Sequence, residues 1–372
     1  MNPSETSMSR VPVAHCPMRS VARSVAAGML AAALAAPLHA QDACSADVDG
    51  DGTVGAADLS LVLSAWGSCA GCAADINDDG AIDAADLSLL LGLWGQPCSG
   101  LPWATVLEAS PDATVVTNPT LRDAIAATGL PWRVRDNGSG IEMVLVPAGT
   151  FNMGCSAATG YSCQSYETPI HAVTISQSYY IGRYEVKQSE WAGVMDYNPS
   201  VFRGKTYPDA ADRPVDSVSW QAVQPFLAAT GLRLPTEAEW EYAYRAGTTT
   251  AYHSMPGTPN GTNNPALLGE IAWWDGNAGG QTHVVGGKAA NALGLHDMSG
   301  NVAEWVADAM DTTYYAWSPS VDPQGPGEGN YRVTRGSSWI SSSPGYFRSS
   351  ARQWAWHTDL PPFYGFRVVR NP

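Results

Sequence analysis

The sequence predicts an α+β protein in which a long irregular domain follows a small all-α domain. Hydrophobic residues make up 45% of the chain and charged residues only 15%, with 14 Trp, 37 Gly and 26 Pro. This composition is typical of a loop-rich fold held together by large aromatic side chains. A duplicated acidic segment with a helical apolar pattern lies near the N-terminus. From residue 141, short β-like runs alternate with Gly and Pro, with too few helices between them for a doubly wound sheet.

Residues 1–40 have the features of a signal peptide. Arg19 and Arg23 precede an apolar run at 25–38, and Ala40 ends a small-residue cleavage site. A transmembrane anchor is the alternative, but the run is short and rich in alanine. We therefore expect export, to a secreted or cell-surface-associated location, and no membrane span after cleavage.

The net charge of −15 argues against a nucleic-acid partner, because phosphate binding needs clustered Lys and Arg. The charge is also uneven along the chain. Ten Asp and no Glu, Lys or Arg lie between residues 41 and 100. Most of the protein's net negative charge therefore comes from residues 41–100.

That acidic segment contains a repeat. DVDGDGTVGAADLSLVLSAWG returns 28 residues later as DINDDGAIDAADLSLLLGLWG. Each copy opens with a 12-residue loop whose clustered oxygen ligands fit a hard cation, and calcium matches their spacing. The predicted ligands are Asp47, Asp49, Asp51, the Thr53 carbonyl and Asp58 in the first loop, and Asp75, Asn77, Asp79, the Ala81 carbonyl, Asp83 and Asp86 in the second. An amphipathic helix follows each loop, with Leu63 and Trp66, then Leu91 and Trp94, in its apolar pattern.

Six cysteines follow the expected signal peptide, and an even number in an exported chain favours disulfides. They are Cys44, Cys69, Cys72, Cys98, Cys155 and Cys163. Zinc at Cys69 and Cys72 is the alternative, but neither a second close cysteine pair nor a nearby His completes such a site. Bonds from Cys44 to Cys69 and from Cys72 to Cys98 would close the two repeats symmetrically, although the sequence does not fix this connectivity. Cys155 and Cys163 bracket a loop and are expected to bond to each other.

The tandem loop and helix, with Asp at the twelfth loop position, resembles a dockerin domain over residues 44–98. The resemblance implies calcium as cofactor and a cohesin-like protein as partner. Loop positions 10 and 11, where dockerins often carry recognition residues, are Ala56-Ala57 and Ala84-Ala85 here. We assign residues 41–100 to this domain.

Residues 101–140 are interpreted as a lead-in segment packed on the domain that follows, because a flexible linker would be richer in Pro, Ser or Gly. In the final domain, 141–372, three helices are predicted at 187–195, 219–230 and 236–246. The third helix is predicted to begin with a capping box, in which Thr236 is the N-cap residue and Glu239 is its reciprocal partner. Gly247 is predicted to end this helix. A last strand is predicted at 366–370.

Seven phrases of the final domain occur in an order that resembles the formylglycine-generating enzyme, or sulfatase-modifying factor, family. They are MVLVPAGTFNMG, YYIGRYEVKQSEW, RPVDSVSW, RLPTEAEWEYAYRAG, NALGLHDMSGNVAEWVAD, RVTRGSSW and YGFRVVR, across residues 143–370. The resemblance implies an elaborated C-type-lectin-like fold with little regular secondary structure.

Active members of that family oxidise a cysteine of a sulfatase to formylglycine, using copper held by two cysteines five positions apart after an R-G-G-S-W/Y phrase. Here the phrase is RGSSW at 335–339, Ser341 stands where the first cysteine would fall, and no cysteine follows Cys163. A hydroxyl cannot replace a thiolate for Cu(I). We therefore expect no copper oxidase and assign no catalytic residue.

The phrase DMSGNVAEW resembles a family calcium site. The resemblance implies the side chains of Asp297 and Glu304 and the carbonyls of Gly300 and Val302 as ligands. The alternative is a turn held by hydrogen bonds of Asn301 and Asp297.

Two functions remain. The first is a non-catalytic binding or assembly module, docked through the repeat, whose C-terminal loops bind an unknown ligand. Short hydroxyl and aromatic side chains suit recognition, and the predicted ligand-binding residues are Ser341, Ser343, Tyr346, Trp354, Trp356 and His357. Packing in the core is the alternative for these aromatic residues. The second function is a formylglycine-generating-type oxidoreductase, or another enzyme of that family, acting on an exported protein substrate.

Overall fold

The computed structural model describes residues 45–49, 54–69, 72–77, 79–95 and 101–372. The expected signal peptide lies outside the described residues, as do Asp51, Thr53, Cys44 and Cys98. Within the described ranges, no helix combines the length and apolar character that crossing a membrane requires. Residues 45–95 and 101–372 are each described on their own.

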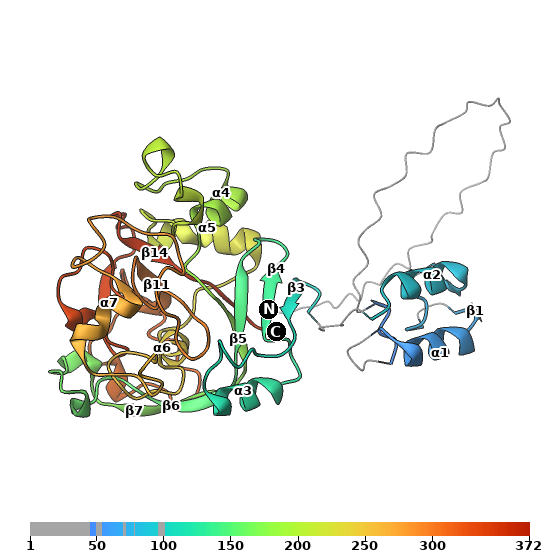
Figure 1. Ribbon diagram of the computed structural model, residues 1–372, viewed down its shortest axis with the longest axis horizontal. Coiled ribbons are helices and arrows are strands. Elements are labelled where there is room, and N and C mark those ends of the chain that lie inside the picture. The colour runs from blue at the N-terminus through green and yellow to red at the C-terminus, as the bar shows by residue number, and fades with distance from the viewer. Residues whose placement is uncertain (1–44, 50–53, 70–71, 78, 96–100) are drawn as a thin grey trace, which may run out of the picture. The chain divides into compact units, whose positions relative to one another are not determined.

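The acidic repeat folds as two helices, α1 (Ala56–Ser64) and α2 (Ala84–Gly92), shown in blue in Figure 1. Val62 and Leu90, at the same position of each repeat, are both fully buried. They pack with Ala46, Val54, Ala74, Ile76 and Ile82 in one small core. A short antiparallel pair, β1 (Gly67–Ser68) with β2 (Ala81–Ile82), joins the two repeats and adds to the predicted all-helical arrangement.

The disulfide in the repeat differs from the symmetrical bridges considered above. Cys69 bonds to Cys72, with their Cα atoms 5.8 Å apart. This Cα–Cα distance lies within the usual disulfide range. Cys155 and Cys163 bond to each other as predicted.

Residues 101–372 contain an antiparallel five-stranded sheet in the order β15-β8-β5-β4-β3. Its strands are β3 (Ala104–Glu108), β4 (Arg133–Asp136), β5 (Glu142–Val146), β8 (Tyr179–Gly182) and β15 (Val369–Arg370). The predicted lead-in segment supplies β3, α3 (Pro119–Ala126) and β4. Because Arg133 of β4 pairs with Val144 of β5, the boundary predicted at residue 140 falls between two hydrogen-bonded strands.

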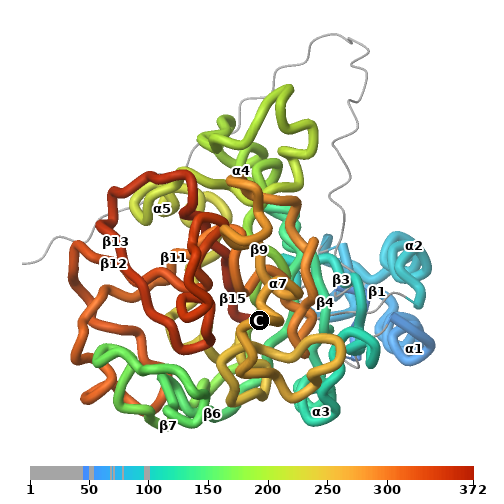
Figure 2. Tube along the Cα trace, turned by 60° about the vertical axis from the view of Figure 1, so that its left-hand side comes forward, coloured from blue at the N-terminus to red at the C-terminus, as the bar shows by residue number. Residues whose placement is uncertain are grey.

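The C-terminal phrases form a four-stranded sheet in the order β13-β12-β11-β14. Figure 2 labels three of its strands, β11, β12 and β13. Its strands are β11 (Ala303–Ala309), β12 (Tyr331–Arg335), β13 (Gln353–Trp356) and β14 (Tyr364–Phe366). Two smaller pairs are β6 (Gly149–Met153) with β7 (His171–Ile175), and β9 (Ala272–Trp273) with β10 (Ser299–Gly300). β13 is an edge strand, which leaves one of its sides unpaired in the sheet.

The three predicted helices of the final domain are α4 (Gln188–Met195), α5 (Trp220–Thr230) and α6 (Glu237–Arg245), and a short α7 (Leu268–Ile271) follows. The capping box of α6 is confirmed. The Thr236 hydroxyl accepts a hydrogen bond from the Glu239 amide at 3.1 Å, and the Glu239 carboxylate accepts one from the Thr236 amide at 2.8 Å. Satisfying two orphan amides in this way fixes where the helix begins.

The single strand predicted at 366–370 is divided between both sheets. Phe366 ends β14, and Val369 begins β15. The guanidinium of Arg367, between them, is fully buried and is hydrogen-bonded to main-chain carbonyls and to Glu304. The chain therefore changes sheets at a residue whose side chain binds both. The α+β, C-type-lectin-like fold class is confirmed.

Candidate functional site

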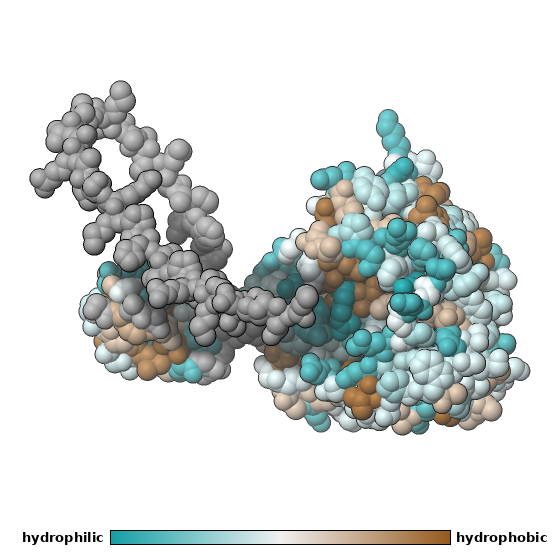
Figure 3. All heavy atoms as spheres, turned by 180° about the vertical axis from the view of Figure 1, so that it is seen from behind, coloured by the Kyte–Doolittle hydropathy of each residue, from teal (hydrophilic) through white to brown (hydrophobic). Residues whose placement is uncertain are grey.

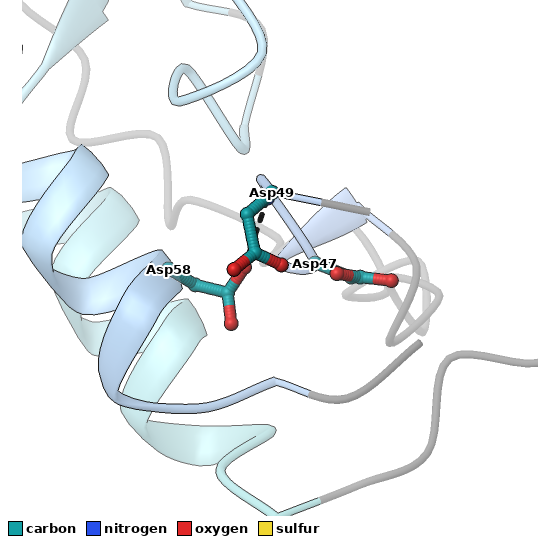
Figure 4. A group of neighbouring side chains, drawn as sticks. All are labelled: Asp47, Asp49 and Asp58. Carbon is teal, nitrogen blue, oxygen red and sulfur yellow. Dashed lines mark hydrogen bonds between the residues drawn. The ribbon is translucent and has the colours of Figure 1, made fainter. Parts of the chain in front are cut away.

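The first acidic loop gathers carboxylates as a calcium site requires. One ligand oxygen each from Asp47, Asp49 and Asp58 lies within 4.8 Å of the others, and Figure 4 shows the Asp49 and Asp58 carboxylates next to each other with that of Asp47 to one side. Asp58, in α1, is fully buried and also closes the loop. Its carboxylate accepts hydrogen bonds from the amides of Val48 (2.7 Å) and Gly55 (2.7 Å). Burial alone would raise the pKa of Asp58, but these amide donors lower it below the usual value, so the group is ionised and suited to a hard cation.

The second loop repeats this closure. Asp86 is fully buried and accepts from the amides of Ile76 (2.8 Å) and Asp83 (2.8 Å). The remaining predicted ligands accept local amides: Asp75 from Gly80, Asn77 from Asp79, Asp79 from Ala81, and Asp83 from Ala85. These oxygens accept hydrogen bonds from the loop's own backbone, and calcium at both loops stays a prediction.

Part of the apolar pattern of each helix faces solvent. Leu63 and Trp66 in the first repeat and Leu91 and Trp94 in the second are all exposed, although the pattern alone would assign them to one apolar face. Figure 3 shows apolar side chains, in brown, on the visible surface of this small body. Ala56, Ala57, Ala84 and Ala85 are exposed as well but offer little contact area. The repeat therefore presents matched Leu and Trp pairs to solvent.

The stretch RGSSWISSSPGYFRSSAR at 335–352 divides into a buried framework and an exposed surface. Its three arginines are buried and paired with carboxylates of distant segments. Arg335 pairs with Glu237 and Glu241 of α6, Arg352 with Glu237, and Arg348 with Glu167. These ion pairs hold the stretch against α6 and against the turn that carries Glu167.

Ser341, which stands where the resemblance would place a copper-binding cysteine, is hydrogen-bonded to another serine. The Ser337 hydroxyl donates a hydrogen bond to the Ser341 hydroxyl at 2.7 Å. Cys155 and Cys163 are bonded to each other, and Arg348 lies 3.4 Å from the Cys155 sulfur. The hydroxyls at 337 and 341 do not fit Cu(I), which soft sulfur ligands select.

The predicted ligand-binding aromatics lie at the surface. Tyr346 is 52% exposed, Trp356 39% and Trp354 37%. Trp354 and Trp356 are two residues apart on β13, so their side chains share one face of the strand. Ser343 is exposed, and Ser341 and His357 are half-buried. The His357 ring lies 5.8 Å from that of Trp356 between centroids, whereas Ser341 is hydrogen-bonded to Ser337.

Two aromatic residues that the sequence analysis missed complete this surface. The edge of the Tyr166 ring meets Trp354 at 5.0 Å, and Tyr331 meets Trp356 at 5.2 Å. Tyr331 lies on β12 directly opposite Trp356, which only the strand pairing reveals. We call Tyr166, Tyr331, Tyr346, Trp354 and Trp356 the aromatic surface. Of the aromatics for which core packing was the alternative, Tyr346, Trp354 and Trp356 are exposed.

In the phrase DMSGNVAEW, where the resemblance implies a calcium site of the final domain, the two predicted carboxylates have other partners. Both oxygens of Glu304 accept hydrogen bonds from Arg367, at 2.6 and 2.7 Å, and one also accepts from Trp240. Asp297 is buried, and one of its oxygens accepts from the Gly286 amide while the other has no partner within the described residues. Burial raises the pKa of Asp297 to about 6. The Glu304 carboxylate is therefore already paired with the Arg367 guanidinium. Calcium at this phrase stays a prediction.

Glu185 was not predicted and lies beside this phrase. Its buried carboxylate accepts from the Val302 amide at 2.9 Å and the Asn301 side chain at 2.7 Å. Burial raises the pKa of Glu185, and the nearby charge of Asp297 raises it further. Asn301 holds the turn, as the alternative reading of this phrase proposed, but its carboxylate partner comes from more than a hundred residues earlier.

Comparison with protein families matches both parts of the chain. The model of the sulfatase-modifying factor enzyme 1-like domain matches residues 116–372, and that of the dockerin type I domain matches residues 45–91. The chaperone protein LppX of Paenibacillus barcinonensis is 31% identical over 62% of this chain and 89% of its own length. The formylglycine-generating enzyme of Streptomyces coelicolor is 29% identical over 53% of this chain and 78% of its own length.

Two solved structures have similar folds. Treponema denticola variable protein 1 shares 30% sequence identity at a TM-score of 0.54, covering 62% of this chain and 95% of its own. PvdO from Pseudomonas aeruginosa shares 28% identity at a TM-score of 0.54, covering 64% of this chain and 98% of its own. The similarity therefore extends across nearly all of each of those proteins.

Proposed function

We propose that this chain, which belongs to the family of sulfatase-modifying factor enzyme 1-like domains, is an exported, non-catalytic binding or assembly module. One observation carries the proposal. Where the resemblance places a copper-binding thiolate, Ser341 instead accepts a hydrogen bond from the Ser337 hydroxyl. Aromatic side chains of the same C-terminal segment face solvent. The segment offers a recognition surface and no soft metal ligand.

The dockerin type I part supplies the attachment in this proposal. Dockerin domains typically bind a cohesin, and a cohesin-like protein is the partner we propose. The exposed Leu63–Trp66 and Leu91–Trp94 pairs support an apolar contact, because exposed large side chains gathered on a small domain mark interaction sites. Calcium held by Asp47, Asp49 and Asp58 would neutralise the clustered carboxylates and hold the first loop in shape.

The aromatic surface is the proposed ligand site, and it can be separated from the core by mutation. Replacing Trp356 or Tyr346 by Ala is expected to lower the free energy of unfolding by less than about 1 kcal/mol, because both rings are exposed. The same change at Phe347, fully buried beside Tyr346, is expected to cost about 3–5 kcal/mol. Chemical denaturation of the three variants measures the difference.

The same variants test binding. Material that co-purifies with the exported wild-type protein in calcium is expected to be lost from the Trp356→Ala and Tyr346→Ala variants at unchanged fold. Full retention by both variants would contradict the aromatic surface as the ligand site. A large loss of stability in both variants would indicate that these rings pack in the core and do not form a binding surface.

A further inference from the structure

We propose that the cavity between Tyr331 and Trp354 binds a basic side chain, lysine or arginine, presented by a protein partner. The cavity has a volume of about 410 Å³ and lies beside the edge strand β13. Its lining includes Tyr331, Trp354, Met310, Thr312, Asp311 and Glu328. This inference rests on the proposed function, because Tyr331 and Trp354 belong to the aromatic surface, and it specifies the chemistry of the ligand.

The two aromatic walls are held in place by neighbouring rings. Tyr331 is 48% exposed, and it lies opposite Trp356, two residues beyond Trp354, so Tyr331 and Trp354 are diagonal neighbours across β12 and β13. Tyr166 supports Trp354, and Trp356 supports Tyr331, both edge-on. The rings are therefore positioned before any ligand arrives, which limits the entropy lost on binding.

The charged side chains that line the cavity are both acidic. One oxygen of Asp311 accepts from the Thr313 amide (2.7 Å) and hydroxyl (2.8 Å), and these hydrogen bonds lower the pKa of Asp311, so it is ionised at neutral pH. Glu328 is exposed and has no ion pair or hydrogen bond within the described part of the chain. The nearby cation Arg352 pairs with Glu237, and its other hydrogen bonds go to the main-chain carbonyls of Tyr166 and Asp311 and not to the Asp311 carboxylate. The cavity therefore carries uncompensated negative charge.

Elsewhere in the described residues, aromatic rings have cations of their own. Arg352 lies 4.2 Å from the Tyr315 ring centroid, Arg332 lies 4.0 Å from that of Trp220, and Lys288 lies 4.0 Å from that of Trp273. Neither Tyr331 nor Trp354 has such a contact in the same residues. Rings and carboxylates are the two groups that attract an ammonium or guanidinium, and this cavity has both without a cation.

The test uses the full chain and two synthetic peptides, Gly-Gly-Lys-Gly-Gly and the same peptide with acetyl-lysine. Saturation-transfer NMR is expected to show contact of the lysine side chain with wild-type protein, and about tenfold weaker binding of the acetylated peptide, which has lost the charge. Trp354→Ala and the Asp311→Asn/Glu328→Gln double variant should each weaken lysine-peptide binding by a similar factor. Tyr197→Ala, an exposed ring elsewhere, and Asp123→Asn, an exposed carboxylate elsewhere, should leave it unchanged.

Equal binding of the two peptides, or no binding of either, would overturn the inference. Weakening by the Tyr197 or Asp123 control as large as that by Trp354→Ala would overturn it too. The proposed function is judged separately by the co-purification experiment. If wild-type protein retains material that Trp356→Ala loses, while neither peptide binds, the ligand is not basic and the proposed function stands. If nothing depends on the aromatic surface in either experiment, both fail.

Discussion

Replacing Arg367 by Met is expected to lower the free energy of unfolding by about 3–5 kcal/mol, because it leaves the buried Glu304 carboxylate without its cation. Both side chains are fully buried, and the guanidinium also donates to the carbonyls of Gly182 (3.0 Å) and His296 (2.9 Å). The change therefore removes the group that binds the two sheets at the point where the chain passes between them. Urea unfolding monitored by intrinsic fluorescence measures the loss.

A double variant distinguishes the unpaired charge from lost packing. Arg367→Met with Glu304→Gln removes both charges and keeps an oxygen that can accept the Trp240 indole hydrogen bond. It is expected to be more stable than Arg367→Met alone, because no unpaired charge stays buried. Equal destabilisation in the single and double variants would show that the ion pair is not the source of the effect.

Removing calcium is expected to abolish the helical circular dichroism of the isolated segment 41–100. Without the ion, the carboxylates of Asp47, Asp49 and Asp58 face one another at short range, and the core of this small body holds too little apolar area to offset their repulsion. Titration with a chelator, followed by calcium, should melt and then restore α1 and α2.

Two controls make the calcium result specific. Asp49→Asn removes one carboxylate from the cluster and should raise the calcium concentration needed for folding. A reduced sample shows what the Cys69–Cys72 bond contributes. Spectra that do not change when the reduced segment loses calcium would contradict the prediction.

Local signals in the sequence predicted local structure well. Thr236 and Glu239 predicted where α6 begins because a capping box is complete within four residues. The pairing of β3 with β4, and of β4 with β5, could not be predicted in this way, because strand pairing depends on partners elsewhere in the chain. The division of the last strand at Arg367 depends on Glu304, 63 residues away, for the same reason.

Only part of the candidate site could be predicted from the sequence. The ion pairs of Arg335 could not be predicted, because its partners Glu237 and Glu241 lie about a hundred residues earlier. The exposure of Leu63 and Trp66 was not foreseen, because periodicity identifies an apolar stripe without showing whether the molecule itself covers all of it. Tyr331 was missed because its place beside Trp356 depends on the register of β12 and β13.

The most direct test of a non-catalytic module is turnover. The reduced protein, loaded with copper under oxygen, is incubated with a cysteine-containing sulfatase peptide, and mass spectrometry follows conversion of the cysteine to formylglycine. The formylglycine-generating enzyme of Streptomyces coelicolor, treated identically, serves as the active control. With Ser341 hydrogen-bonded to Ser337 where a thiolate would be needed, we predict no tightly held copper and no converted peptide. Copper-dependent conversion by the wild-type chain would contradict the account.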